Sequence, residues 1–152
     1  MSIKKLYLNY ASKLEVVKDI VPPLAFRLIL AYGFYEPAMM KLHDIHSIGE
    51  WFEGLGVPAP YFQAYLATFT ECLGVVLLIL GLGTRIITIP LIITMLVAIK
   101  TVHLANGFPA GDNGYEIPLY YILMLLSLLF TGAGKVSVDY LLSRKFAADK
   151  AV

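Results

Sequence analysis

Six ionisable side chains stand in or beside stretches of this 152-residue chain that are otherwise apolar. They are Arg27, Glu36, Glu71, Lys100, His103 and Tyr120, with Tyr121 beside the last and with Lys41 and Glu116 at the outer boundary of their stretches. Ionisable groups in an apolar span usually face the interior of a helix bundle or a wet cavity, so each one marks a candidate functional site. Carboxylates, a lysine, an imidazole and a phenol together could bind a polar ring or move protons.

The positions of these residues along their helices suggest partners. The height of each residue can be measured from the predicted cytoplasmic end of its helix, at a rise of about 1.5 Å per residue. Glu36 and Lys100 then lie at about the same height, near 21 to 22 Å, which predicts an ion pair between them. Arg27 lies closer to the cytoplasmic end, at about 9 Å, and its predicted partner is Glu71 at about 16 Å. Lys100 and His103, three residues apart, are predicted to share a helix face. The alternative is that such pairs only fix helix packing.

A metal site has weaker support. Met40, His43 and His46 follow one another at three-residue intervals, and thioether with imidazole suits copper. Methionine is also ordinary packing material, and no spacing here is a tight metal signature, so no metal ligand is assigned and copper is kept as an alternative. Cys72 is the only cysteine, which excludes an internal disulfide or a CxxC motif. No sequence motif encodes a bound cofactor.

The elements that must position these residues are helices. Hydrophobic residues make up 59% of the chain and charged residues 15%, whereas soluble domains carry about 25% charge. Each of four apolar stretches approaches the roughly 20 residues that cross a bilayer: Val21–Leu42, Pro60–Leu82, Ile86–Ala105 and Glu116–Ala133. The predicted fold is an all-α, integral membrane four-helix bundle. A helical bundle in water would have too little polar surface to cover these runs.

The distribution of basic residues predicts the orientation. Nine of the twelve Lys and Arg lie in the N-terminal segment, the Gly83–Arg85 turn and the C-terminal tail, so both termini are predicted to be cytoplasmic. The predicted organisation is a cytoplasmic segment at 1–20, a transmembrane domain at 21–134 and a cytoplasmic tail at 135–152. In the first external loop, Ile48–Leu55 is predicted to form a short amphipathic helix on the membrane surface. The net charge of +1 gives no reason to expect nucleic-acid binding.

Several short stretches, in this order, resemble the DoxX family of bacterial membrane proteins. They are Arg27-Leu28, Lys41-Leu42, Gly54–Pro60, Glu71 with Gly74, Leu80–Arg85, Ala98–His103 with Gly107-Phe108, and Gly132–Gly134 with Ser137 and Asp139. The resemblance implies a four-helix bundle in the bacterial inner membrane and a loose association with redox chemistry. Similar proteins include a subunit of thiosulfate:quinone oxidoreductase and members linked to oxidative-stress complexes. The Glu36-Pro37 pair and the stretch around His43 resemble a subgroup that accompanies copper-related peptide modification.

The leading hypothesis is a quinone-associated redox or oxidative-stress subunit that works with a membrane or periplasmic redox partner. Its quinone pocket would open to the outer half of the bilayer and would be lined by Glu36, Glu71, Lys100, His103 and Tyr120, with Arg27 deeper. A subunit is expected rather than an enzyme acting alone, because the chain has no motif for a redox cofactor. The alternatives are a non-enzymatic partner for copper or a modified peptide, and a structural scaffold.

Overall fold

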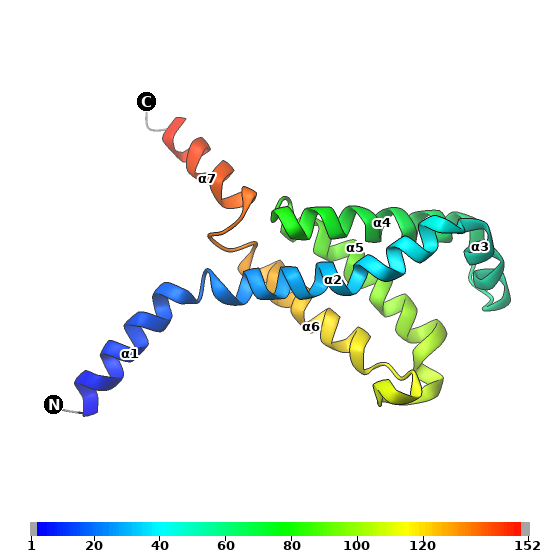
Figure 1. The fold of residues 1–152 in the computed structure, drawn as a ribbon, viewed down its shortest axis with the longest axis horizontal. Helices are drawn as coiled ribbons and strands as arrows, with labels where there is room; N and C mark the ends of the chain where they lie inside the picture. The colour runs from blue at the N-terminus through cyan, green and yellow to red at the C-terminus, as the bar shows by residue number, and fades with distance from the viewer. Residues whose placement is uncertain (1–2, 150–152) are drawn as a thin grey trace.

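The computed structural model describes residues 3–149, which form helices and loops with no β-strand among them. The α-helices are α1 Ile3–Val17, α2 Val21–His43, α3 Ile45–Gly54, α4 Pro60–Leu80, α5 Thr84–Ala98, α6 Glu116–Thr131 and α7 Val138–Asp149 (Figure 1). A π-helical turn at Ile99–His103 and a 3₁₀ turn at Leu104–Asn106 extend α5, and another 3₁₀ turn covers Ala110–Asp112. The predicted all-α class is confirmed.

Local signals explain where the long helices begin and end. Proline starts α4 at Pro60, where a missing N–H costs nothing because the first amides of a helix have no partner. Gly81 and Gly83, with φ of 64° and 56°, end α4 and begin α5 in the left-handed region that glycine adopts without strain. The two helices therefore turn back on each other within three residues.

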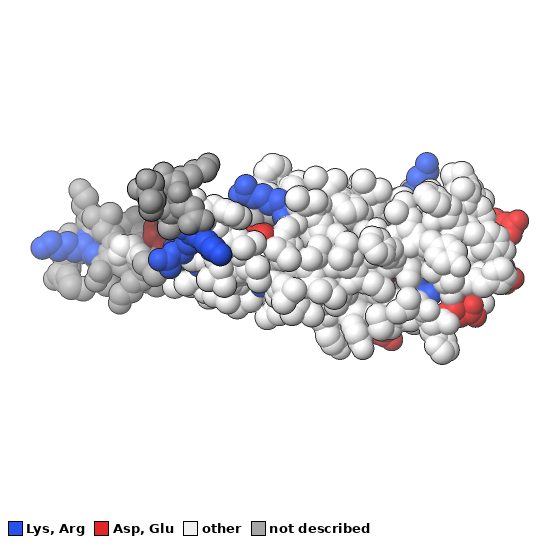
Figure 2. Space-filling view, turned by 90° about the horizontal axis from the view of Figure 1, so that it is seen from above, with Lys and Arg blue, Asp and Glu red and all other residues white. Residues whose placement is uncertain are grey.

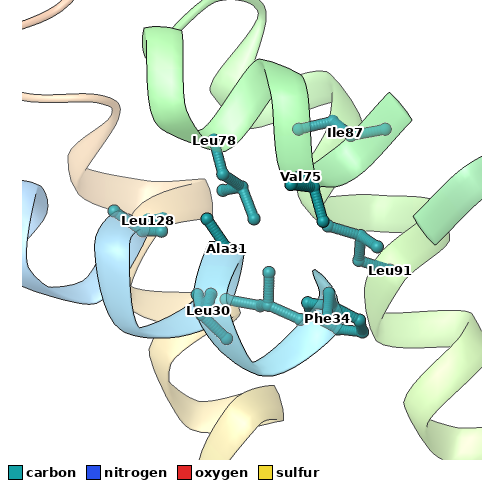
Figure 3. Close-up of a cluster of buried hydrophobic side chains, with 9 residues drawn as sticks. Leu30, Ala31, Phe34, Val75, Leu78, Ile87, Leu91 and Leu128 are labelled. Atoms are coloured by element: carbon teal, nitrogen blue, oxygen red, sulfur yellow. The ribbon is translucent and has the colours of Figure 1, made fainter. Parts of the chain in front are cut away.

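Helices α2, α4, α5 and α6 pack around one apolar core. Helix α2 packs mainly against α4 and α6, and α5 contacts the same two helices from the other side. The core side chains are Leu30, Ala31, Phe34, Val75, Leu78, Ile87, Leu91, Leu125 and Leu128 (Figure 3). Helix α3 packs against α4 at the end of the molecule opposite to α1 and α7, both of which project from the other end (Figure 1).

The outer surface between these ends is largely apolar. Figure 2 shows a face on which charged side chains gather towards the two ends and the middle is almost all uncharged. Exposed apolar surface on this scale marks contact with a membrane or another protein. Among the described residues, Pro60–Leu80 and Thr84–Asn106 are long and apolar enough to cross a membrane, and Glu116–Thr131 is a shorter apolar helix.

Candidate functional site

A cavity of about 760 Å³ lies among α2, α3, α4, α6 and the extended α5. Its wall is mainly apolar, which is typical of sites for small organic molecules, whose volumes run from about 300 to 1,000 Å³. The polar or ionisable side chains in the wall are Lys41, Gln63, Thr70, Glu71, Thr94, Thr101, His103, Asn113 and Tyr121. A few polar groups in an apolar wall can orient a ligand that is itself mostly apolar.

A buried ion pair joins α2 and α4 in this wall. Nζ of Lys41 lies 3.0 Å from Oε1 and 2.7 Å from Oε2 of Glu71, so one ammonium group donates to both carboxylate oxygens. The side chain of Glu71 is 3% exposed and that of Lys41 is 15% exposed. Ala38, fully buried on α2, has its carbonyl oxygen 4.0 Å from Sγ of Cys72 on α4. This close approach lets the Lys41 ammonium reach across to α4.

Arg27 does not pair with Glu71, so that prediction was wrong. Nε of Arg27 donates to the carbonyl oxygen of Leu78 at 2.8 Å, and Nη2 donates to that of Ile79 at 3.1 Å. Nη1 donates to the carbonyl oxygens of Ala133 at 2.7 Å and Val136 at 2.8 Å. The last four carbonyls of a helix lack partners within the helix, and Arg27 satisfies two of them at the end of α4. The sequence held a signal for these unpaired carbonyl groups, because Gly81 marks the end of the helix.

Glu36 and Lys100 do not form the predicted ion pair, and both side chains are exposed. Neither takes part in an ion pair with any residue of the described range. The physical reason is that α4 and α6 are the packing partners of both α2 and α5, so these two helices lie diagonally across the bundle. Neither residue belongs to the wall of the cavity.

His103 does line the cavity, while Lys100 on the same turn does not. Both lie in the π-helical turn, whose wider i→i+5 hydrogen bonding changes the angle between residues three apart. Of the two residues predicted to share a face, only His103 therefore reaches the cavity. Nδ1 of His103 is 2.8 Å from the carbonyl oxygen of Asn113 and must donate to it, because a carbonyl oxygen only accepts. In the neutral ring, Nε2 is then left as an acceptor.

Tyr121, rather than Tyr120, reaches the cavity. Tyr120 is exposed, and its hydroxyl group donates to Oε1 of Glu116 at 2.9 Å. Tyr121 crosses α2 at Gly33, where the Tyr121 hydroxyl group occupies the space that a Cβ atom would need. Its ring centroid lies 5.5 Å from that of Phe34. A neighbouring position on a helix is rotated by about 100°, which decides which of the two tyrosines enters.

The candidate copper ligands do not all line the cavity. All three side chains are exposed, and Met40 alone among them lines the cavity. Nε2 of His46 lies 3.7 Å from Oε1 of Glu50, and its ring centroid lies 5.2 Å from that of Tyr61. Within residues 3–149 there is no group of three or more His, Cys, Asp or Glu side chains that could hold a metal ion. Copper binding stays a prediction.

The fold and the cavity define an all-helical membrane protein with an apolar cavity and a buried ion pair in its wall. The DoxX family model matches residues 23–104, and the chain belongs to the DoxX family. This range contains the whole of α4 and α5 and all of α2 but its first two residues, and thus both members of the Lys41–Glu71 pair. The family assignment from the sequence is confirmed.

Relatives from three bacteria match most of the chain. An uncharacterized protein of Haemophilus influenzae is 31% identical over 138 residues, which are 88% of this chain and 91% of that protein. An uncharacterized membrane protein of Mycobacterium tuberculosis is 32% identical over 84% of this chain and 86% of its own length. A Bacillus subtilis protein named "Putative oxidoreductase CatD" is 30% identical over 76% of this chain and 83% of its own length. No solved structure matches the chain.

Proposed function

We propose that this protein is a quinone-binding subunit of a redox complex in the bacterial inner membrane. The observation that carries the proposal is the mainly apolar cavity of about 760 Å³ with the Lys41–Glu71 ion pair in its wall. A quinone has an apolar ring, an apolar tail and two carbonyl oxygens, so it needs a dry pocket with a few hydrogen-bonding groups. The oxidoreductase name of the Bacillus subtilis relative supports a redox role.

The proposal includes a topology in which α2, α4, α5 and α6 all cross the membrane. At about 1.5 Å per residue, the 23 residues of α2 extend about 35 Å, enough for a hydrocarbon core of about 30 Å. The 16 residues of α6 extend about 24 Å, so the bilayer must thin locally around it. With an even number of spans both termini lie on one side, consistent with α1 and α7 leaving the same end (Figure 1). The basic residues of that end support a cytoplasmic location.

The cavity offers both donors and acceptors to a quinone. The Lys41 ammonium and the Tyr121 hydroxyl group can donate to the carbonyl oxygens of the oxidised ring. The Glu71 carboxylate and Nε2 of neutral His103 can accept from the hydroxyl groups of the reduced ring. Reduction of a quinone takes two electrons and two protons. In this proposal a partner oxidoreductase supplies the electrons, and the polar side chains of the cavity hold the ring and pass on protons.

Trp51 is the only tryptophan of the chain, and it lines the cavity, so its fluorescence reports on occupancy. We expect saturable quenching when short-tailed ubiquinone or menaquinone analogues are added to the reconstituted protein. Glu71→Gln and Lys41→Met should each weaken quinone binding by about tenfold, since a hydrogen bond to a charged group contributes about 1.5 to 3 kcal/mol. The matched controls are Glu36→Gln and Lys100→Met, which change exposed residues outside the cavity and should bind as the wild type does.

Two outcomes would contradict the proposal. The first is wild-type protein whose fluorescence is not quenched saturably by either quinone class. The second is equal weakening by the control variants, because that would show that quenching does not report on this cavity. A pure scaffold predicts that the variants change thermal stability while no quinone shifts it, which separates that hypothesis from ours.

A further inference from the structure

A second cavity, of about 1,110 Å³, lies at the end of the molecule from which α1 and α7 project. The segments around it are the corner between α1 and α2, the turn between α4 and α5, the loop between α6 and α7, and α7 itself. None of its lining residues belongs to the cavity that contains the Lys41–Glu71 pair. The two cavities are therefore separate candidate sites.

Basic side chains from three segments converge on this second cavity: Lys18, Arg85 and Lys135. Nη2 of Arg85 donates to the carbonyl oxygen of Phe130 at 3.1 Å, and Arg85 has no acidic partner within the described range. A guanidinium group carries five N–H donors, so most of those of Arg85 remain for a ligand. Lys135 lies 3.2 Å from Asp19, and Lys18 pairs with Glu15. Such exposed ion pairs contribute little and can exchange for a stronger anion.

The acidic groups in the same wall do not cancel this basic character. Asp139 is already occupied, because its two carboxylate oxygens accept from the backbone N–H groups of Gly83 at 2.7 Å and Thr84 at 3.0 Å. Asp19, half-exposed beside Lys135, is the other carboxylate of the wall. The wall thus holds three basic side chains and two carboxylates, which leaves it a net positive charge. An anion entering between them meets an excess of positive charge.

The cavity also has an apolar side. Ile86, Leu142 and Phe146 line it, and Ile86 and Phe146 are 76% and 61% exposed. A small soluble anion gains no binding energy from contact with apolar side chains. A phospholipid does, because it carries acyl chains next to its phosphate. The cavity lies where α4 ends, α5 begins and α6 ends, which is the level of the lipid headgroups in a protein whose helices cross the bilayer.

We propose that this cavity binds the phosphate group of an anionic phospholipid, with Arg85 and Lys135 as the main phosphate ligands and Ile86 and Phe146 against its acyl chains. Basic pockets between membrane helices recognise anionic headgroups in this way. The inference depends on the protein lying in a membrane and is independent of quinone binding in the other cavity. Anionic lipid would tie the three loops of this end together and so stabilise the bundle.

The test compares phosphatidylglycerol with phosphatidylcholine in neutral detergent micelles that contain the full-length protein. We expect phosphatidylglycerol to raise the thermal midpoint and to remain bound in native mass spectra, and phosphatidylcholine to do neither. The double variant Arg85→Gln/Lys135→Gln should bind phosphatidylglycerol at least about tenfold more weakly, since each basic residue near a charged surface contributes appreciably. The matched control, Arg144→Gln/Lys145→Gln, removes the same charge from α7 without touching the wall and should bind normally.

Native mass spectrometry keeps the test valid if the double variant is less stable, because it counts bound lipid directly. Equal loss of phosphatidylglycerol from the control variant would overturn the proposal, since net charge and not the cavity would then govern binding. Unchanged binding by the Arg85→Gln/Lys135→Gln protein would overturn it as well. In a third arm, inorganic phosphate is added to phosphatidylcholine micelles. If phosphate stabilises the protein as much as the lipid does, the ligand is a soluble anion and the lipid proposal is wrong.

Discussion

Replacement of Lys41 by methionine would leave the carboxylate of Glu71 buried without its cation. The Nζ to Oε2 distance is 2.7 Å. At an effective dielectric constant of about 20, the gross attraction across that distance is about 6 kcal/mol. Transfer of two charged groups out of water costs several kcal/mol, so the net contribution of the intact pair is small. The loss of only one partner is different, because the cost of burial then remains without the attraction.

We therefore expect Lys41→Met to lower the free energy of unfolding by about 3 to 5 kcal/mol. The double variant Lys41→Met/Glu71→Leu replaces the pair by apolar side chains of similar size. It should lie within about 1 kcal/mol of the wild type. The double variant would thus be more stable than the single one, while losing the quinone binding proposed for the cavity.

The assay is reversible unfolding in mixed micelles with increasing dodecyl sulfate, followed by circular dichroism and by Trp51 fluorescence. The matched control is Glu36→Leu/Lys100→Met, which also removes one acidic and one basic residue, but from exposed positions without an ion pair. It should change the stability by less than about 0.5 kcal/mol. A double variant at Lys41 and Glu71 that is as unstable as the sum of its single variants would refute the reasoning, because the two side chains would then contribute independently.

Three further predictions concern residues outside the cavity or at its edge. Arg27→Lys should cost about 2 to 4 kcal/mol in the same unfolding assay, because one ammonium cannot reach the carbonyls of both segments that the planar guanidinium joins; unchanged stability would contradict this role. Asp44 accepts hydrogen bonds from the backbone N–H and the hydroxyl group of Ser47, and these bonds lower the pKa of its carboxyl group. The stabilisation of α3 by Asp44 is therefore present at neutral pH and is lost as the pH falls through this lowered pKa. The protection factors of the α3 amides, which correct the exchange rates for their intrinsic dependence on pH, should therefore fall in acid for the wild type and be low at both pH values for Asp44→Ala. Copper titration should show no difference between the wild type and His43→Ala/His46→Ala, because the two imidazoles are exposed and outside the cavity wall; a loss of copper binding in the variant would support the metal hypothesis.

The helices were predictable because their signals are local. The predicted stretch Val21–Leu42 corresponds to α2 at Val21–His43, and Pro60–Leu82 corresponds to α4 at Pro60–Leu80. Continuous apolar runs with proline at the start and glycine at the end need no knowledge of distant residues. The short helix that was predicted at Ile48–Leu55 is α3 at Ile45–Gly54. It begins earlier because Asp44 caps it through Ser47.

The partners of the charged residues were not predictable in the same way. Depth along a helix suggested Glu36 with Lys100 and Arg27 with Glu71, and neither pair exists. Depth says nothing about the direction in which a side chain points around its helix or about which helices are neighbours. Lys41 was placed only at the boundary of its span, yet its four-carbon chain lets the ammonium reach Glu71. Backbone carbonyls, which satisfy Arg27, were left out of the search for partners.

The sequence by itself determined that this is a helical membrane protein of the DoxX family, and it determined which ionisable groups stand in the apolar helices. These conclusions follow from composition, local punctuation and ordered motifs, all of which are properties of the chain alone. Only the tertiary structure decided that Lys41, Glu71, His103 and Tyr121 share one cavity while Glu36, Lys100 and Tyr120 face outward. The physical reason is rotational: one position along a helix turns a side chain by about 100°, and packing against neighbouring helices decides which direction is buried.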